Sequence, residues 1–157
     1  MENKPLQDFN FYDYSDVEIS FSIKTKTLDL KTLTDFLKLN PTRGWTIGEK
    51  YIGKQLNTDT KEINIIERQR PWTMFVFESK SLVTSKRFHE HAEHLLEKLD
   101  AIQGALKDLI VQPDKFEILI QIYLKFDPKQ DYFGFSSDAE TLKRMANYCQ
   151  HIEWRNK

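Results

Sequence analysis

Cysteine is nearly absent from this chain of 157 residues, since Cys149 is the single one, which excludes an internal disulfide and favours a reducing compartment. Glycine occurs only five times and never in a cluster, which disfavours phosphate-cradling loops. No apolar run approaches the roughly 20 residues of a membrane span, and residues 1–8 lack the basic-then-apolar pattern of a signal peptide. We therefore expect a cytoplasmic protein that does not enter the membrane.

An excess of one charge is also lacking. The 23 lysines and arginines are balanced by 24 acidic residues, for a net charge of −1. Such a chain has no global field that would draw it onto nucleic acid, so a nucleic-acid partner is disfavoured. The hydrophobic content of 39% and charged content of 30% are those of a globular protein, and the length suits one domain with a sizeable core.

Catalytic and metal-binding motifs are missing as well. There is no Gly-x-Ser-x-Gly nucleophile elbow, and no carboxylate pair is marked by a motif. On a helix, His89, His91 and His94 point in directions that do not converge on a metal, so we expect them on a solvated flank. Cys149 lies on an apolar stripe, which predicts a small buried hydrophobe rather than a nucleophile. We expect no enzymatic activity, no metal and no cofactor.

What the sequence does contain is clear periodicity. Alternating apolar residues predict strands at residues 17–24, 62–68, 116–126 and 151–155, and an extended segment at 45–52 that turns near Gly48. Residues 71–77 are apolar on both faces, which predicts a central strand of the sheet. Residues 53–61 are polar and predict a loop. Helical spacing predicts a first helix capped by Thr27 or Asp29, an unbroken helix over residues 88–110, and a last helix opened by a Ser137/Glu140 capping box.

This order predicts an α+β fold with a mainly antiparallel sheet and helices packed on one face. The core is a ferredoxin-like β-α-β-β-α-β pattern, extended by a C-terminal helix and strand. We divide the chain into an acidic aromatic N-terminal arm over residues 1–15 and a single α+β domain over residues 16–157.

The densest run of specific residues lies at positions 37–48. Pro41 ends the first helix near Leu39, and Gly44 and Gly48 bracket Trp45. If the tryptophan-bearing segments are neighbouring strands, guanidinium and indole groups gather along one edge. The members of this group are Arg43, Trp45, Arg68, Arg70 and Trp72. Two interpretations stay open: a structural salt-bridge and cation–π cluster, or a site for a carboxylate, phosphate or nucleobase.

The N-terminal arm mixes acidic and aromatic side chains. Its candidate partner-binding residues are Asp8, Phe9, Phe11, Tyr12, Asp13, Tyr14 and Asp16. Here too, two interpretations stay open. Either the arm packs its aromatic rings on the domain, or it presents them with its carboxylates to a basic partner.

Four motifs stand out along the chain: Leu37-x-Leu39-x-Pro41-Thr42-Arg43-x-Trp45-x-x-Gly48, Pro71-Trp72, Leu95-Leu96-x-x-Leu99 and Gly134-Phe135. In these motifs the chain resembles a bacterial group known as domain of unknown function 4279. The resemblance implies no established activity. Some relatives are thought to be immunity proteins that neutralise a bacterial toxin, and the resemblance implies the same role here.

From these observations we expect a non-enzymatic protein-binding protein, in its most specific form an immunity protein that occludes a cognate toxin. The alternative is a small-molecule or nucleotide binding domain that uses the Arg/Trp group.

Overall fold

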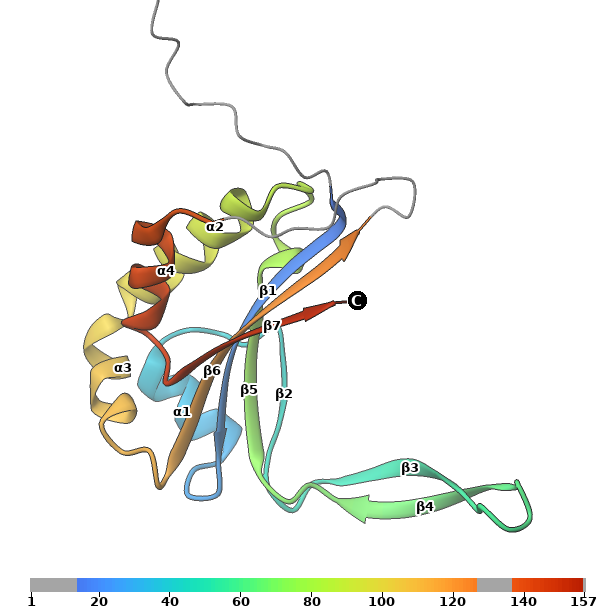
Figure 1. Ribbon diagram of the computed structural model, residues 1–157. Coiled ribbons are helices and arrows are strands. Elements are labelled where there is room, and N and C mark those ends of the chain that lie inside the picture. The colour runs from blue at the N-terminus through green and yellow to red at the C-terminus, as the bar shows by residue number, and fades with distance from the viewer. Residues whose placement is uncertain (1–13, 127–136, 157) are drawn as a thin grey trace, which may run out of the picture.

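The computed structural model describes residues 14–126 and 137–156, in which a five-stranded sheet forms the centre of the molecule (Figure 1). In spatial order the strands are β2 (Arg43–Trp45), β5 (Thr73–Glu78), β1 (Tyr14–Thr25), β6 (Phe116–Phe126) and β7 (His151–Asn156). All neighbours are antiparallel except β6 and β7, which are parallel. The predicted α+β fold with a mainly antiparallel sheet is confirmed, while its ferredoxin-like description stays a prediction.

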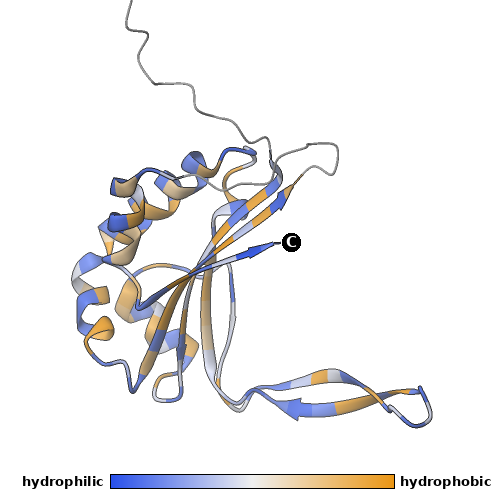
Figure 2. Ribbon diagram, viewed as in Figure 1, coloured by the Kyte–Doolittle hydropathy of each residue, from blue (hydrophilic) through white to orange (hydrophobic). Residues whose placement is uncertain are grey.

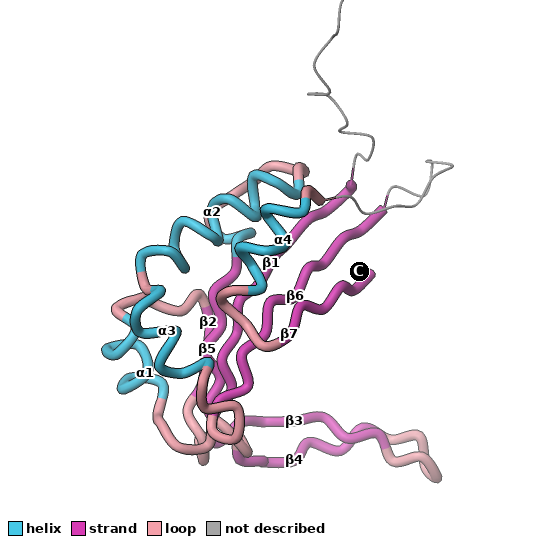
Figure 3. The backbone as a smooth tube through the Cα atoms, turned by 60° about the vertical axis from the view of Figure 1, so that its left-hand side comes forward, coloured by secondary structure: helices cyan, strands magenta, loops and turns pink. Residues whose placement is uncertain are grey.

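Helices cover one face of this sheet, as Figures 1 and 3 show. They are α1 (Leu30–Leu37), α2 (Phe88–Ala101), α3 (Gln103–Ile110) and α4 (Ala139–Ala146), with a short 3-10 turn η1 (Ser79–Ser81) before α2. None of the described helices has the length and apolar character needed to cross a membrane. The helices place their apolar sides against the sheet, so the core lies in a single layer between the two (Figure 2).

The core follows from strict alternation in the two central strands. In β1, Ile19, Phe21 and Ile23 face the helices and are fully buried, and in β6 the same holds for Ile118 and Ile120. Because β1 and β6 pair over their whole length, these side chains form one continuous apolar surface on the side of the sheet that faces the helices. Leu33 and Leu37 of α1, Leu95, Leu96 and Leu99 of α2, and Leu106 of α3 cover it.

A second, two-stranded sheet projects from the end of the main sheet. It is a hairpin of β3 (Lys50–Leu56) and β4 (Ile63–Gln69), inserted between β2 and β5 and pointing away from the helices (Figures 1 and 3). The predicted loop at residues 53–61 is therefore wrong in its first half, because β3 continues to Leu56. The segment is polar since neither of its faces joins the core, and a polar sequence does not prevent strand pairing in an exposed ribbon.

The predicted unbroken helix over residues 88–110 is also wrong. It breaks at Ile102, whose N–H is donated to the carbonyls of Leu99 and Asp100. The apolar residues on both sides of the break still face the sheet, so the periodicity continues and conceals it. The predicted Ser137/Glu140 capping box is replaced by Asp138, whose carboxylate accepts from the N–H of Thr141 at 2.8 Å.

Candidate functional site

The segment at positions 37–48 is a joint between α1, the main sheet and the hairpin. α1 is capped by Asp29, one of the two predicted caps, and ends at Leu37, after which Lys38 takes a left-handed conformation. Thr42 then donates both its backbone N–H and its hydroxyl to the carbonyl of Val76, which fixes the start of β2 against β5. Gly44 is required here, because a Cβ at this position would lie 2.5 Å from the carbonyl oxygen of Met74.

Two members of the Arg/Trp group meet at the base of the hairpin. The guanidinium of Arg70 lies 4.2 Å from the centre of the Trp45 ring and 3.9 Å from the centre of the Tyr51 ring. The cation therefore contacts one aromatic ring from the main sheet and one from the hairpin. Cation–π contacts of this kind are worth about 0.5–2 kcal/mol each, so Arg70 braces the hairpin against β2. Tyr51 was missed in the sequence, where nothing but its aromatic character marks it.

The other three members of the group lie apart from this contact. Arg43 forms an ion pair with Glu78 at 2.5 Å on the edge of the main sheet. Arg68 is bonded to Gln55 across the hairpin at 3.2 Å. Trp72 precedes β5 and packs under the ammonium group of Lys24, 4.3 Å from its ring centre. The structure thus brings Arg70 and Trp45 together and distributes the rest of the group among other partners.

Three donors of the Arg/Trp group have no acceptor within the described residues: Nε1 of Trp45, Nε of Arg70 and Nε1 of Trp72. All three atoms are shielded from solvent by their surroundings, and a shielded donor without an acceptor costs about 1–3 kcal/mol.

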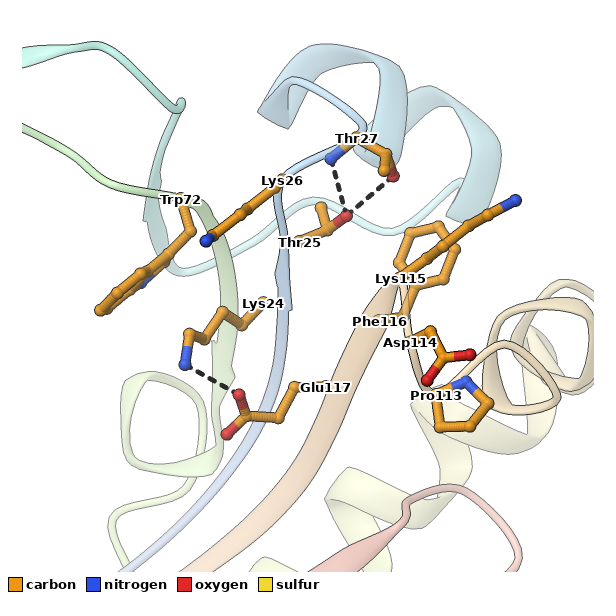
Figure 4. Close-up of a pocket in the computed structure, with 10 residues that line it drawn as sticks. All are labelled: Lys24, Thr25, Lys26, Thr27, Trp72, Pro113, Asp114, Lys115, Phe116 and Glu117. Atoms are coloured by element: carbon orange, nitrogen blue, oxygen red, sulfur yellow. Dashed lines mark hydrogen bonds and ion pairs between the residues drawn. The ribbon is translucent and has the colours of Figure 1, made fainter.

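An open cleft of about 280 Å³ lies beside Trp72, at the end of β1 and β6 (Figure 4). Lys24, Lys26 and Lys115 contribute ammonium groups to its lining, and Asp114 and Glu117 contribute carboxylates. One of these cations is already neutralised, because Nζ of Lys24 lies 2.8 Å from Glu117. The cleft is thus weakly basic and open to solvent, with an aromatic wall.

One face of the hairpin carries four strongly exposed apolar side chains. In the β3–β4 register Ile52 lies opposite Glu67, Lys54 opposite Ile65, and Leu56 opposite Ile63, and directly opposed residues share a face. Four apolar residues therefore line one side of the ribbon; we call them the hairpin apolar face. They are Ile52, Leu56, Ile63 and Ile65, which are exposed by 75%, 59%, 63% and 73%.

The opposite side of the ribbon holds Tyr51 and Arg68, directly opposed in the register. Since Tyr51 is the residue that contacts Arg70, this is the side on which the hairpin is braced to the main sheet. The hairpin apolar face therefore points away from the brace. The alternation of Ile63 and Ile65 was visible in the sequence, but it predicts only a strand with one apolar side and does not say what covers that side.

A buried pair formed by Ser79 and His91 joins η1 to α2. The sequence predicts that His91 lies on a solvated flank of its helix. That prediction is wrong: His91 is 1% exposed, and its Nδ1 lies 2.8 Å from Oγ of Ser79. Ser79 Oγ accepts from the N–H of Ile19, so its own hydroxyl is free to donate to Nδ1, and Nε2–H donates to the carbonyl of Ser85. These hydrogen bonds connect η1 to β1 and α2. Because Ser79 is fully buried, its hydroxyl is not accessible to a substrate as a nucleophile.

Three further titratable groups, Cys149, Tyr148 and Asp100, have shifted pKa values because of burial or contacts within the fold. Cys149 is buried, as predicted, and burial raises the pKa of its thiol to about 11. Burial and the neighbouring Asp100 carboxylate raise the pKa of Tyr148 to about 12. Hydrogen bonds from Tyr148 and Arg144 in turn hold the pKa of Asp100 below its usual range, which links α2 to α4. Within residues 14–126 and 137–156, no three His, Cys, Asp or Glu side chains are grouped to hold a metal.

The candidate partner-binding arm falls mostly outside the described residues, which include neither Asp8, Phe9, Phe11, Tyr12 and Asp13 nor the Gly134-Phe135 pair. Of its last two members, Tyr14 begins β1, is 5% exposed and packs edge-on against Phe126. Asp16 forms an ion pair with Lys80 at 2.8 Å. The strand therefore begins three residues before the predicted position, and Tyr14 belongs to the core rather than to an exposed arm.

An α+β domain with one helix-covered sheet face and a projecting β-hairpin is thus the class of protein that the fold defines. The sequence profile of the family described as Domain of unknown function (DUF4279) matches residues 15–156, so the chain belongs to that family. No curated protein and no solved structure matches the chain.

Proposed function

We propose that this protein is a protein-binding protein whose hairpin apolar face is its contact surface for another protein. The observation that carries the proposal is the gathering of Ile52, Leu56, Ile63 and Ile65 on one side of a ribbon that projects from the domain. Contiguous exposed apolar surface is unfavourable in water and, on a folded protein, marks an interaction site.

The surroundings of this face support a protein partner over a small ligand. The face lies on a two-stranded ribbon that projects from the domain, whereas small-molecule sites are concave. Charged side chains at its base, the ion-paired Lys50 and Glu67, form a polar rim beside the apolar centre. An apolar centre with a polar rim is the usual arrangement of a protein–protein contact surface.

In its most specific form the proposal is an immunity function, in which the bound protein is a bacterial toxin and the bulk of the domain blocks its active site. The family resemblance motivates this form. The projecting hairpin would then anchor the toxin, while the main sheet provides the steric obstacle.

The test uses the full chain and one charge placed on each side of the hairpin. Ile52→Lys introduces a cation into the apolar face, and Asn64→Lys introduces the same charge on the opposite side. A partner that copurifies from the native host in fixed stoichiometry, or the product of a neighbouring gene, is titrated against wild type and both variants. We expect Ile52→Lys to weaken binding about tenfold or more, and Asn64→Lys to bind as wild type does.

Equal loss in both variants, or no loss in Ile52→Lys, would contradict the assignment of the apolar face. For the immunity form, coexpression with the neighbouring toxic gene product should restore growth with wild type and Asn64→Lys but not with Ile52→Lys. Binding without restored growth would retain the protein-binding function and exclude immunity.

A second candidate, a site for a small anionic molecule, is favoured by the cleft at Trp72. Lys26 and Lys115 line it together with the indole, a combination that suits an aromatic carboxylate or a nucleotide (Figure 4). Thermal-shift screening with such ligands tests it. We expect Lys26→Ala to abolish the ligand-induced shift without lowering the ligand-free melting temperature, whereas a shift that survives the substitution excludes the cleft.

A further inference from the structure

The outer edge of β4 has backbone groups directed away from the hairpin. At one end of the hairpin the backbone N–H of Arg70 donates to the carbonyl of Glu49 at 2.9 Å. At the other end the backbone N–H of Asn57 donates to the carbonyl of Glu62 at 2.8 Å. In an antiparallel pair the backbone groups alternate in direction along a strand. The even-numbered residues of β4 therefore bond to β3, and Ile63, Ile65 and Glu67 turn their N–H and carbonyl groups outward. Among the described residues no strand pairs with this edge.

The two edges of the hairpin differ in how they are protected. β3 carries Lys50, Lys54 and Gly53, and edge lysines and glycines discourage the pairing of further strands. β4 opens with Ile63-Asn64-Ile65-Ile66, three β-branched residues without lysine, glycine or proline. A short segment of this composition pairs readily with another strand when it is exposed at an edge. The β4 edge is therefore the one available for strand addition.

We propose that β4 pairs antiparallel with β4 of a second copy of this chain, forming a two-fold dimer with a four-stranded sheet across the interface. The strand is self-complementary for this pairing. With the two-fold axis at Ile65, Glu62 lies opposite Arg68 of the partner subunit, and the same ion pair repeats on the other side of the axis. No two like charges stand directly opposite each other, since Ile63 faces Glu67 and Asn64 faces Ile66.

The dimer also explains how the hairpin is maintained. An isolated two-stranded ribbon is marginally stable in water, whereas additional strands make a sheet independently stable. In the dimer the two hairpin apolar faces lie side by side on the same surface, because the two-fold axis is perpendicular to the sheet. The inference goes beyond the proposed function, since it requires no foreign partner.

Proline substitutions separate the two edges without breaking the hairpin. Ile65 and Lys54 lie opposite each other, and both turn their N–H groups outward. Ile65→Pro removes an outward donor from β4, and Lys54→Pro removes the corresponding donor from β3, while the hydrogen bonds between the strands remain. Molar mass measured by sedimentation over a range of concentrations should show a dimer for wild type and Lys54→Pro and a monomer for Ile65→Pro.

Cysteine crosslinking tests the position of the two-fold axis. In a hydrogen-bonded antiparallel pair the two Cα atoms at Ile65 are about 5.5 Å apart, which is within the range of a disulfide. Ile65→Cys should therefore give a covalent dimer under mild oxidation, and Lys54→Cys should not. The native Cys149 is buried, so wild type should stay uncrosslinked.

A wild-type chain that is monomeric at all concentrations would overturn the dimer, as would a dimer lost in Lys54→Pro but kept in Ile65→Pro. These outcomes are distinguishable from failure of the proposed function. Ile52→Lys, which lies on β3 away from the β4 edge, tests the foreign partner, and the dimer is measured with no partner present.

Discussion

The main sheet and the hairpin are built from the same kind of sequence and have opposite surroundings. Ile118 in β6 and Ile65 in β4 each follow a polar residue in a strand, yet Ile118 is completely buried and Ile65 is 73% exposed. The difference arises because helices cover the apolar side of the main sheet, whereas no described element covers that side of the hairpin. Alternation thus predicts that a strand has an apolar side, and the tertiary structure decides whether folding or binding uses it.

The largest expected effect comes from truncating one isoleucine in each region. Ile118→Ala should lower the free energy of unfolding by about 2–5 kcal/mol, because it leaves a cavity in a closed core. Ile65→Ala should change it by no more than about 0.5 kcal/mol in dilute protein, because its side chain is already in water. Urea unfolding of both variants measures the contrast, and equal losses would mean that the hairpin face is covered within the monomer.

A smaller effect is expected at the buried Ser–His pair. Ser79→Ala leaves the N–H of Ile19 and Nδ1 of His91 without their partner in a dry environment. We expect a loss of about 1–3 kcal/mol in the free energy of unfolding. The matched control is Ser81→Ala on the exposed end of the same turn, where water replaces the lost bond to Glu78. If Ser79→Ala costs no more than this control, the pair contributes nothing to the core.

The brace at Arg70 should affect the hairpin alone. Arg70→Ala removes both ring contacts, so amide hydrogen exchange in β3 and β4 should accelerate by an amount corresponding to about 1 kcal/mol, while β1 and β6 keep their protection. Arg68→Ala, which removes only a bond to Gln55, serves as the control. Faster exchange throughout the main sheet would show that the two regions unfold as one unit.

The smallest effect concerns acid. Hydrogen bonds from Tyr148 and Arg144 lower the pKa of Asp100 from 3.8 in the folded chain, so its contribution to stability is complete above that value and is lost as pH falls through the folded pKa. Because the group is partly exposed, solvent screening keeps the contribution small. Asp100→Asn should flatten the dependence of the melting temperature on pH below about 4. An unchanged slope would assign acid sensitivity to other carboxylates.

Several elements could be predicted from the sequence because the signals are local. β6 begins and ends at the predicted residues, since its alternation is long and strict. Asp29 caps α1 as expected, and Cys149 is buried on its apolar stripe. The resemblance to the family was drawn in part from residues 37–48, and the profile match over residues 15–156 shows the membership.

The candidate site could be predicted only in part. The two tryptophan-bearing segments do come together, because β2 pairs with β5, and Arg70 meets Trp45. Arg43, Arg68 and Trp72 find other partners, and their choice depends on residues distant in sequence, such as Glu78 and Lys24. The hairpin apolar face was missed because the isoleucines were assigned to a strand of the core sheet.

The sequence by itself determined the α+β class, the long central strands of the main sheet and the Asp29 cap of α1, because propensity and periodicity act over a few neighbouring residues. Only the tertiary structure decided that the helix breaks at Ile102, that His91 is buried and that β3 and β4 leave the main sheet. Each of these depends on which surfaces meet after the chain has folded back on itself. An apolar side chain becomes part of the core when another element of the fold covers it, and part of a contact surface when no element does.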